Sequence, residues 1–246
     1  RLAFEVGLKV PNCFIVIAPH GDPLYVIERY DRIISKEKVS RVHQQDFCQA
    51  LGFLSSNKYE HKGGPSFKDC YDLILTKTDS NKRYEFASQL LDWLCFNLLI
   101  GNNDAHAKNI SLLFENKKIA LAPFYDILST EIYPKLNREF SFQIGDRDLG
   151  INIGKNQFNL LERKLEIKEN ALVNRMVKLQ ERVLEKKDKL LKDTLDEFKD
   201  DLEYPLFYMD FETIFPAVPI HDESRPYQQI PFQFSLHIQR SKNASL

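Results

Sequence analysis

The first part of the chain alternates between short apolar runs and apolar residues at helical spacing. Residues 2–6 end near Gly7, in the way that the last turns of a helix end. The runs 13–18 and 24–28 enclose the turn-forming segment His20-Gly21-Asp22-Pro23. These two runs therefore predict a β-hairpin.

Three helices are predicted in the next stretch. Residues 46–54 place apolar side chains at helical spacing, and Ser66 follows Gly63-Gly64-Pro65 as a helix cap. Residues 86–100 carry apolar side chains around most of the helical circumference, which is typical of a buried helix. Gly101 supplies a left-handed C-cap for this helix. A second hairpin is predicted from residues 110–114 and 119–121, which flank a polar turn.

The pattern changes twice in the second half. Residues 155–202 are charged and free of Gly and Pro, and they predict one or two amphipathic helices. A solvated bundle helix is favoured over a coiled coil, because no strict heptad is sustained. Residues 205–238 are rich in aromatics and proline, with strands predicted at 206–209 and 232–238.

The predicted fold class is α+β, mostly α. Short β-hairpins and a helical bundle are expected in a first domain at 1–200. A fragmentary, strand-rich segment is expected at 204–246.

Composition narrows the possible partners. The 246 residues include 34 basic and 35 acidic side chains, so the net charge of −1 gives no electrostatic case for nucleic acid or membrane as an obligatory partner. None of the 4 cysteines stands in a C-x-x-C pair, which argues against a zinc site and favours a reduced, cytoplasmic protein. The longest apolar stretch, 90–100, is too short to span a bilayer. The first ten residues lack a signal-peptide run, and the chain is expected to start partway through a domain.

The segment with the most chemistry is Ile-Gly-Asn-Asn-Asp-Ala-His-Ala-Lys-Asn at residues 100–109. Asp104 and Asn109 keep the spacing of an Asp and an Asn in the catalytic loop of protein kinases. The Asp of such a loop orients the substrate hydroxyl, and the Asn amide oxygen reaches a metal on the phosphates. Asp126, which follows the second hairpin, is the candidate second acidic ligand for Mg²⁺. An Asp and an Asn after a Gly are also ordinary turn residues, so spacing alone leaves a purely structural role open.

Five blocks in order resemble the HipA family of bacterial serine/threonine kinases. They are Ile27-Glu28-Arg29-Tyr30-Asp31-Arg32, Gln44-Gln45-Asp46-Phe47-Cys48-Gln49, Lys58-Tyr59-Glu60 with Gly63-Gly64-Pro65, Asp104-Ala-His106-Ala-Lys108-Asn109, and Phe124-Tyr125-Asp126-Ile127. The resemblance covers most of residues 2–130.

The resemblance implies roles for individual residues. Asp104 is the implied catalytic base, and Lys108 is implied to neutralise the transferring phosphoryl group. The implied Mg²⁺ ligands are Asn109 and Asp126. The implied ATP-binding residues are Glu28, Tyr30, His106 and Tyr125, where a core or ion-pair role for Glu28, Tyr30 and Tyr125 stays open.

The chain also departs from the kinase pattern. No G-x-G-x-x-G precedes the expected hinge, and Lys9 follows a helix end instead of lying on a strand. The nucleotide lobe is therefore expected to be largely missing. Weak or absent kinase activity is predicted for the chain alone.

The C-terminal segment carries a second resemblance. Tyr204 to Thr213 resembles the first strand of an RNase H-like, DEDD-type exonuclease, in which an Asp and a Glu two residues apart share a metal. Asp210 and Glu212 are the matching residues here. The resemblance covers about 40 residues, and a two-metal site needs further carboxylates downstream.

The leading hypothesis is ATP-dependent phosphorylation of a protein serine or threonine. The HipA resemblance implies a bacterial protein such as an aminoacyl-tRNA synthetase as substrate, and a helix-turn-helix antitoxin as partner, with DNA contacted only through that antitoxin. A non-catalytic antitoxin-binding module and a metal-dependent nuclease fragment are the alternatives.

Overall fold

The computed structural model describes residues 1–18, 21–35, 38–190, 206–214 and 230–239. The chain divides into two compact units, Arg1–Asp188 and Lys189–Leu246. Each unit is described by itself.

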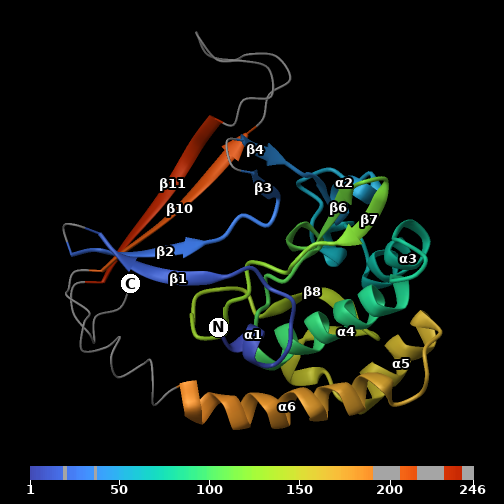
Figure 1. Cartoon of the computed structure of the whole chain (residues 1–246). Coiled ribbons are helices and arrows are strands. Elements are labelled where there is room, and N and C mark those ends of the chain that lie inside the picture. The colour runs from blue at the N-terminus through green and yellow to red at the C-terminus, as the bar shows by residue number, and fades with distance from the viewer. Residues whose placement is uncertain (19–20, 36–37, 191–205, 215–229, 240–246) are drawn as a thin grey trace. The chain divides into compact units, whose positions relative to one another are not determined.

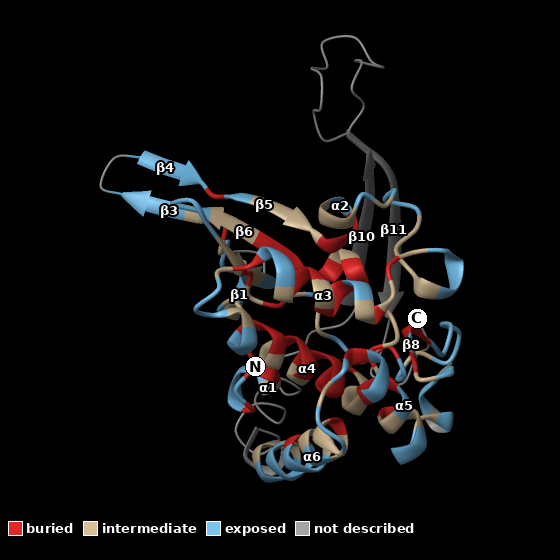
Figure 2. Cartoon of the chain, turned by 90° about the vertical axis from the view of Figure 1, so that its right-hand side faces the viewer, coloured by how far each residue is buried: buried red, intermediate tan, exposed pale blue. Residues whose placement is uncertain are grey.

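The first unit is built around one central helix, α4 (Arg83–Ile100), whose side chains Leu90, Trp93 and Leu94 are fully buried. Helix α3 (Phe67–Lys77) packs against α4, and the buried residues of both appear in red in Figure 2. Ser66 caps α3, because its hydroxyl accepts from the Asp69 backbone while the Asp69 carboxylate bonds back to Ser66. The predicted helix 86–100 is confirmed, and it begins three residues earlier at Arg83.

A three-stranded antiparallel sheet lies beside these helices (Figure 1). Its strand order is β5 (His43–Asp46), β6 (Ser111–Glu115) and β7 (Lys118–Leu121). Helix α2 (Phe47–Leu51) follows β5 directly, with Asp46 as its N-cap. Because Asp46 pairs with Ser111, the sheet brings the start of α2 next to the residues that follow the 101–109 loop.

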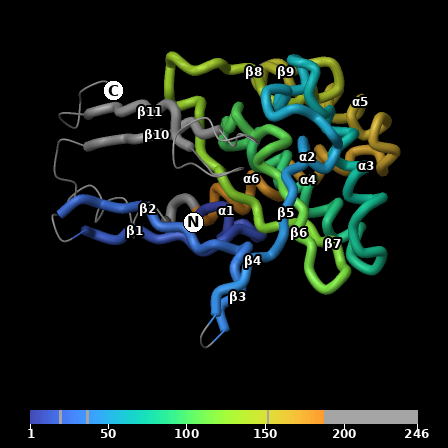
Figure 3. The backbone as a smooth tube through the Cα atoms, turned by 90° about the horizontal axis from the view of Figure 1, so that it is seen from above, coloured from blue at the N-terminus to red at the C-terminus, as the bar shows by residue number. Residues whose placement is uncertain are grey.

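Three two-stranded hairpins surround this core. β1 (Cys13–Ile17) pairs with β2 (Pro23–Ile27), and β8 (Glu139–Ile144) pairs with β9 (Arg147–Leu149). The third hairpin joins β3 (Arg32–Ser35) to β4 (Lys38–Arg41), and Figures 2 and 3 show it extending away from the helices. The predicted hairpins at 13–28 and 110–121 are confirmed, whereas β3–β4 and β8–β9 were not predicted.

Helices close the other side of the first unit. Helix α5 (Lys155–Leu165) and helix α6 (Ala171–Leu190) together account for the predicted amphipathic stretch up to residue 190. The part of that prediction at 191–202 lies outside the described residues. The remaining short helices are α1 (Leu2–Glu5) and the 3₁₀ helices Glu60–Lys62, Ala107–Asn109 and Gly150–Asn152. No helix in the described part of the chain is long and apolar enough to cross a membrane.

The second unit contains one long antiparallel hairpin. Strand β10 (Leu206–Ile214) pairs with β11 (Ile230–Gln239), so both predicted strands are present and longer than predicted. Asp210 and Glu212 lie two positions apart on β10, opposite Ser235 and Gln233.

Candidate active site around Asp104

The loop that carries Asp104 begins where α4 ends. Gly101 terminates α4 in the left-handed conformation, with φ of 66°. A Cβ on Gly101 would lie 2.7 Å from the Glu131 Cβ, so glycine also permits the close approach of the 129–131 segment. The loop then passes Asp104 and enters the 3₁₀ helix Ala107–Asn109 before β6.

Two buried asparagines fix the start of this loop. The Asn102 side-chain amide donates to Asn97 Oδ1 at 2.7 Å and to the Asp126 carbonyl oxygen at 3.2 Å. Asn97 in turn donates to the Trp93 carbonyl oxygen within α4 at 2.8 Å. The central helix, the Asp104 loop and the Asp126 backbone are thereby linked by one chain of hydrogen bonds.

Thr130 forms a second link between the same segments. Its hydroxyl donates to the Gly101 carbonyl oxygen at 3.0 Å and accepts from the Asn103 backbone at 2.8 Å. The Ser141 hydroxyl of β8 donates to the Asn103 carbonyl oxygen at 2.7 Å. The backbone on the N-terminal side of Asp104 is therefore held from two directions.

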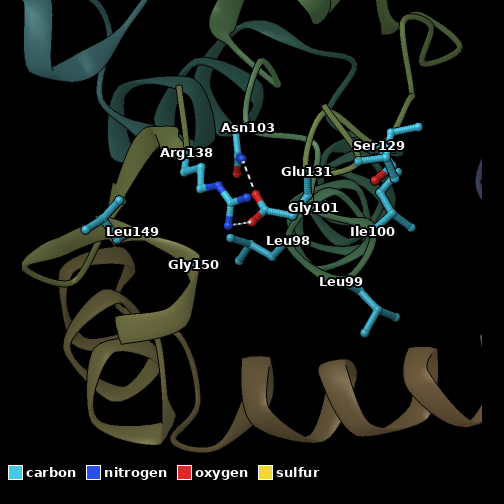
Figure 4. Close-up of a pocket in the computed structure, with 11 residues that line it drawn as sticks. Leu98, Leu99, Ile100, Gly101, Asn103, Ser129, Glu131, Arg138, Leu149 and Gly150 are labelled. Atoms are coloured by element: carbon cyan, nitrogen blue, oxygen red, sulfur yellow. Dashed lines mark hydrogen bonds and ion pairs between the residues drawn. The ribbon is translucent and has the colours of Figure 1, made fainter. Parts of the chain in front are cut away.

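A cavity of about 680 Å³ lies on the Asn103 side of the loop (Figure 4). The Asn103 amide donates to Glu131 Oε2 at 2.9 Å, and Arg138 pairs with Glu131 Oε1 at 2.8 Å. The rest of the lining is largely apolar and includes Leu98 and Leu149. Asp104 does not line this cavity, so we treat the Asn103–Glu131–Arg138 chain as a support for the loop.

The Asp104 carboxylate itself is half exposed, and three side chains converge on its Oδ1 atom. The Tyr59 hydroxyl donates to it at 2.5 Å, the His106 Nε2 lies 3.7 Å away, and the Lys58 ammonium lies 3.9 Å away. The carboxylate therefore combines access to solvent with a fixed orientation. Both are properties that a general base needs.

His106 lies next to this carboxylate and is 4% exposed. Burial lowers the pKa of His106 to about 4, although the nearby charge of Asp104 acts in the opposite direction. The ring is therefore neutral at neutral pH. Its Nδ1 atom is buried and has no hydrogen-bond partner among the described residues. Such an atom is suited to a polar partner that is absent from the structure.

Asn109 ends the loop that carries Asp104, and the Asp126 carbonyl oxygen accepts a hydrogen bond from Asn102 of the same loop. The Asn109 side chain is buried, and its amide nitrogen donates to the Asp104 carbonyl oxygen at 3.1 Å. The amide oxygen of Asn109 is thus the atom that remains as a candidate metal ligand. Asp126 has a φ of 57°, in the left-handed region of backbone conformation. This conformation is unusual for a residue other than glycine.

These donors suit Mg²⁺ better than a transition metal. Magnesium prefers oxygen ligands and is commonly held by one or two carboxylates together with nucleotide phosphates and water. Within the described residues, no group of three or more His, Cys, Asp and Glu side chains is arranged to hold a metal. Asp126 and Asn109 stay the candidate residues that would hold such an ion together with the phosphates, and the ion would supply charge neutralisation.

The aromatic residues predicted to bind the nucleotide are neighbours. The rings of Tyr30 and Tyr125 have centroids 6.1 Å apart. The Tyr30 hydroxyl donates to Gln44 Oε1 at 2.9 Å, and the Tyr125 hydroxyl donates to the Lys108 carbonyl oxygen at 2.7 Å. Glu28 is exposed and accepts from the Asn12 amide at 2.7 Å.

Tyr25 of β2 is mostly exposed. Partial burial raises the pKa of Tyr25 to about 12, with smaller contributions from Cys13 and from the charge of Asp126. Burial raises the pKa of Asp46, and the positive charge of Lys108 opposes that rise.

Lys58 and Tyr59 belong to one block of the HipA resemblance, which implied no role for either residue. The structure places both against Asp104. The signal available in the sequence was the compact block Lys58-Tyr59-Glu60 followed by Gly63-Gly64-Pro65. Asn97, Asn102 and Thr130 carried no comparable signal, because isolated polar residues near a loop are common.

Comparison with known proteins shows the family of the first unit. The family model "HipA-like C-terminal domain" matches residues 1–188, and the chain belongs to this family. A second model, "Domain of unknown function (DUF2779)", matches residues 207–245. That match gives no support to the exonuclease resemblance of the C-terminal segment.

Among curated proteins, the chain is 44% identical over 148 residues to "Putative kinase Y4mE" of Sinorhizobium fredii, covering 60% of this chain and 34% of the relative. It is 32% identical over 195 residues to the serine/threonine-protein kinase toxin HipA of Shewanella oneidensis, covering 74% of this chain and 44% of the relative. The chain thus spans less than half the length of these relatives.

The structure is also similar to a solved complex of HipA, HipB and their operator DNA from Shewanella oneidensis. The TM-score is 0.68 at 27% sequence identity, covering 82% of this chain and 48% of that chain. The mixture of helices and small antiparallel sheets is therefore the HipA type of fold.

Proposed function

We propose that this chain carries the catalytic part of an ATP-dependent protein serine/threonine kinase of the HipA type. The observation that carries the proposal is the arrangement around Asp104. A half-exposed carboxylate is oriented by Tyr59, and its loop is tied through Asn102 to the backbone of Asp126. A phosphotransferase needs such a base close to a metal ligand.

In this proposal Asp104 accepts or orients the proton of the substrate hydroxyl. Asn109 and Asp126 hold Mg²⁺ on the phosphates of ATP, and Lys108 contributes positive charge near the transferred group. Tyr30, Tyr125, Glu28 and His106 form the nucleotide side of the site. The neighbouring rings of Tyr30 and Tyr125 support a stacking role for that pair.

The proposed substrate is a bacterial protein such as an aminoacyl-tRNA synthetase, and the proposed partner is a helix-turn-helix antitoxin. The solved Shewanella complex, which contains HipA, HipB and operator DNA, supports the partner proposal. A low transfer rate is expected for this chain, because no G-x-G-x-x-G stands before the segment that resembles the hinge.

Transfer of the γ-phosphate from radiolabelled Mg-ATP to α-casein tests the proposal. We expect slow transfer by the wild-type chain and a loss of about 100-fold or more in Asp104→Asn. Asp146→Asn is the control, because Asp146 is an exposed carboxylate on the β8–β9 turn. Equal rates in wild type and Asp104→Asn would refute the assignment of Asp104.

Nucleotide binding is tested separately by thermal unfolding with Mg-ATP. A ligand at 100 times its Kd stabilises the folded state by about 2.7 kcal/mol. We expect this stabilisation in the wild type and a smaller one in Asp126→Asn. A chain that neither binds Mg-ATP nor transfers phosphate would instead support the non-catalytic binding module.

A further inference from the structure

We propose that Tyr59 is a positioning residue for Asp104: its hydroxyl holds one carboxylate oxygen so that the other faces the substrate hydroxyl. This inference rests on the proposed kinase function. Neither the family resemblance nor the sequence pattern assigned Tyr59 a role.

The contact is direct. The Tyr59 hydroxyl donates to Asp104 Oδ1 at 2.5 Å, across 45 positions of sequence. His106 Nε2 and the Lys58 ammonium approach the same oxygen at 3.7 Å and 3.9 Å. All three contacts involve Oδ1, which leaves Oδ2 as the oxygen available to a substrate hydroxyl.

The Tyr59 ring is held on several sides. The Lys58 and Lys62 ammonium groups each lie 5.0 Å from the ring centroid, within the range of cation–π attraction. The ring stacks on His61 with centroids 5.6 Å apart and meets His106 edge-on at 5.5 Å. A tyrosine held in this way gives its hydroxyl a fixed direction at a low entropic cost.

Two glycines form a tight turn in the backbone that follows Tyr59. Gly63 takes the left-handed conformation with φ of 78°, and the Gly64 backbone donates to the Tyr59 carbonyl oxygen at 2.9 Å. A Cβ on Gly64 would lie 2.5 Å from the Asn57 carbonyl oxygen and 2.7 Å from that of Tyr59. The second glycine is therefore required for the tight loop that presents Tyr59.

Glu60 anchors the other end of the Lys58-Tyr59-Glu60 block. Its carboxylate accepts from the Gln143 backbone of β8 at 2.9 Å and pairs with Lys164 of α5 at 3.8 Å. Tyr59 is thus fixed between a glycine loop and a contact with the helical part of the unit. Within the block, Tyr59 contacts Asp104 and Glu60 holds the segment against β8 and α5.

The fixed orientation of the Asp104 carboxylate affects the rate of phosphate transfer. A base whose carboxylate can rotate spends part of its time turned away from the reacting hydroxyl, and a displacement of about 1 Å can cost about 100-fold in rate. Tyr59 prevents this rotation through its hydrogen bond to Asp104 Oδ1. Its loss should therefore lower kcat and leave the KM for ATP unchanged.

The experiment compares the wild type with Tyr59→Phe, using radiolabelled Mg-ATP and α-casein as acceptor. The control is Tyr71→Phe, which removes the hydroxyl of a buried tyrosine on α3. We expect kcat to fall about 10- to 100-fold in Tyr59→Phe, with the KM for ATP changed less than about twofold. We expect neither parameter to change in Tyr71→Phe.

A spectroscopic measurement accompanies the kinetics. The Asp104 carboxyl resonance is assigned by ¹³C NMR from its absence in Asp104→Asn. It should move in Tyr59→Phe and stay in place in Tyr71→Phe. An unmoved resonance in Tyr59→Phe would overturn the contact on which the inference rests.

The remaining outcomes are separable. Transfer by the wild type at an unchanged rate in Tyr59→Phe would overturn the inference and leave the kinase proposal standing. Phosphotyrosine at position 59 by mass spectrometry would also overturn it, since Tyr59 would then be an acceptor. Absence of both Mg-ATP binding and phosphate transfer in the wild type would overturn the kinase proposal, and the positioning role would fall with it.

Discussion

His106 is a neutral histidine held against a carboxylate, and its protonation is linked to folding. Its pKa is lowered from 6.5 to about 4, chiefly by burial. Between these two values the unfolded chain binds more protons than the folded one, so stability is present above pH 6.5 and is lost as the pH falls toward 4. The shift corresponds to at most about 3 kcal/mol.

We therefore predict that His106→Gln shows a shallower loss of stability between pH 6.5 and 4 than the wild type. Urea unfolding at pH 8, 6.5, 5.5 and 4.5 measures the difference. The pH 8 value serves as the internal reference for each protein, because the substitution itself changes stability. Parallel pH curves for the two proteins would show that His106 is not the linked group.

Asp31 is a buried carboxylate shared by arginines at the base of the β3–β4 hairpin. Arg29 contacts it at 2.7 Å and Arg32 at 2.5 Å, and hydrogen bonds from these two arginines lower the pKa of Asp31 to about 2. Arg41 lies 4.0 Å away and is largely exposed. The two closer pairs therefore dominate.

Asp31→Asn is predicted to destabilise the chain by about 2 kcal/mol, because the arginines lose their partner while remaining close together. Arg41→Gln should cost less than about 0.5 kcal/mol, as expected for an exposed and distant pair. Equilibrium urea unfolding of the two variants measures the contrast. Similar losses of stability in both variants would mean that the close pairs of Asp31 with Arg29 and Arg32 contribute no more than the distant pair with Arg41.

At the scale of elements, the Gly63-Gly64 turn connects fold and proposed chemistry. Gly64→Ala places a methyl group within 2.7 Å of the carbonyl oxygens of Asn57 and Tyr59, so the backbone must shift. We predict a loss of about 1–3 kcal/mol in stability and a fall in transfer rate like that of Tyr59→Phe. Gly150→Ala is the control, because nothing lies within 4 Å of its added Cβ.

The measurements are thermal unfolding and phosphate transfer by the same preparations. A normal transfer rate in Gly64→Ala would show that the glycine turn does not determine the position of Tyr59. An effect of Gly150→Ala on stability as large as that of Gly64→Ala would make the steric argument wrong.

The elements that could be predicted from the sequence are those whose structure depends on residues close together in the chain. Helix α4 and the β1–β2 hairpin each carry their pattern and their terminating residues within one stretch of chain. The pairing of β5 with β6 joins His43 to Phe114, and no local pattern specifies such a distant partner. The short strands of β3–β4 are mostly exposed, so they lack the alternation that marks a half-buried strand.

The same distinction holds for the candidate site. The spacing of Asp104 and Asn109 lies within one loop and was readable as a kinase-like pattern. The contact of Tyr59 with Asp104 depends on how the 57–64 loop folds over the carboxylate. A sequence shows the glycines that permit such a loop, but it does not show which side chain the loop presents or to which partner.

At the scale of the whole molecule, the first unit closes with α6. Leu172 and Leu179 of this helix are buried, and Arg182 donates to the Val6 carbonyl oxygen at 2.7 Å. Arg175 also bonds Ser88 and Asp92 of α4. The long amphipathic helix therefore contributes its apolar face to the core of this unit, while its charged face is turned to solvent.

We predict that a fragment of residues 1–188 unfolds in one cooperative transition, because all of these contacts lie within it. A fragment of residues 1–168 loses α6 and should be less stable by about 5 kcal/mol or more, since removing each buried leucine alone costs about 2–5 kcal/mol. Circular dichroism during urea unfolding of both fragments and the full chain measures this. Equal stability of the two fragments would mean that α6 is dispensable for the core. A fragment 1–188 without a cooperative transition would mean that the first unit depends on residues 189–246 to fold.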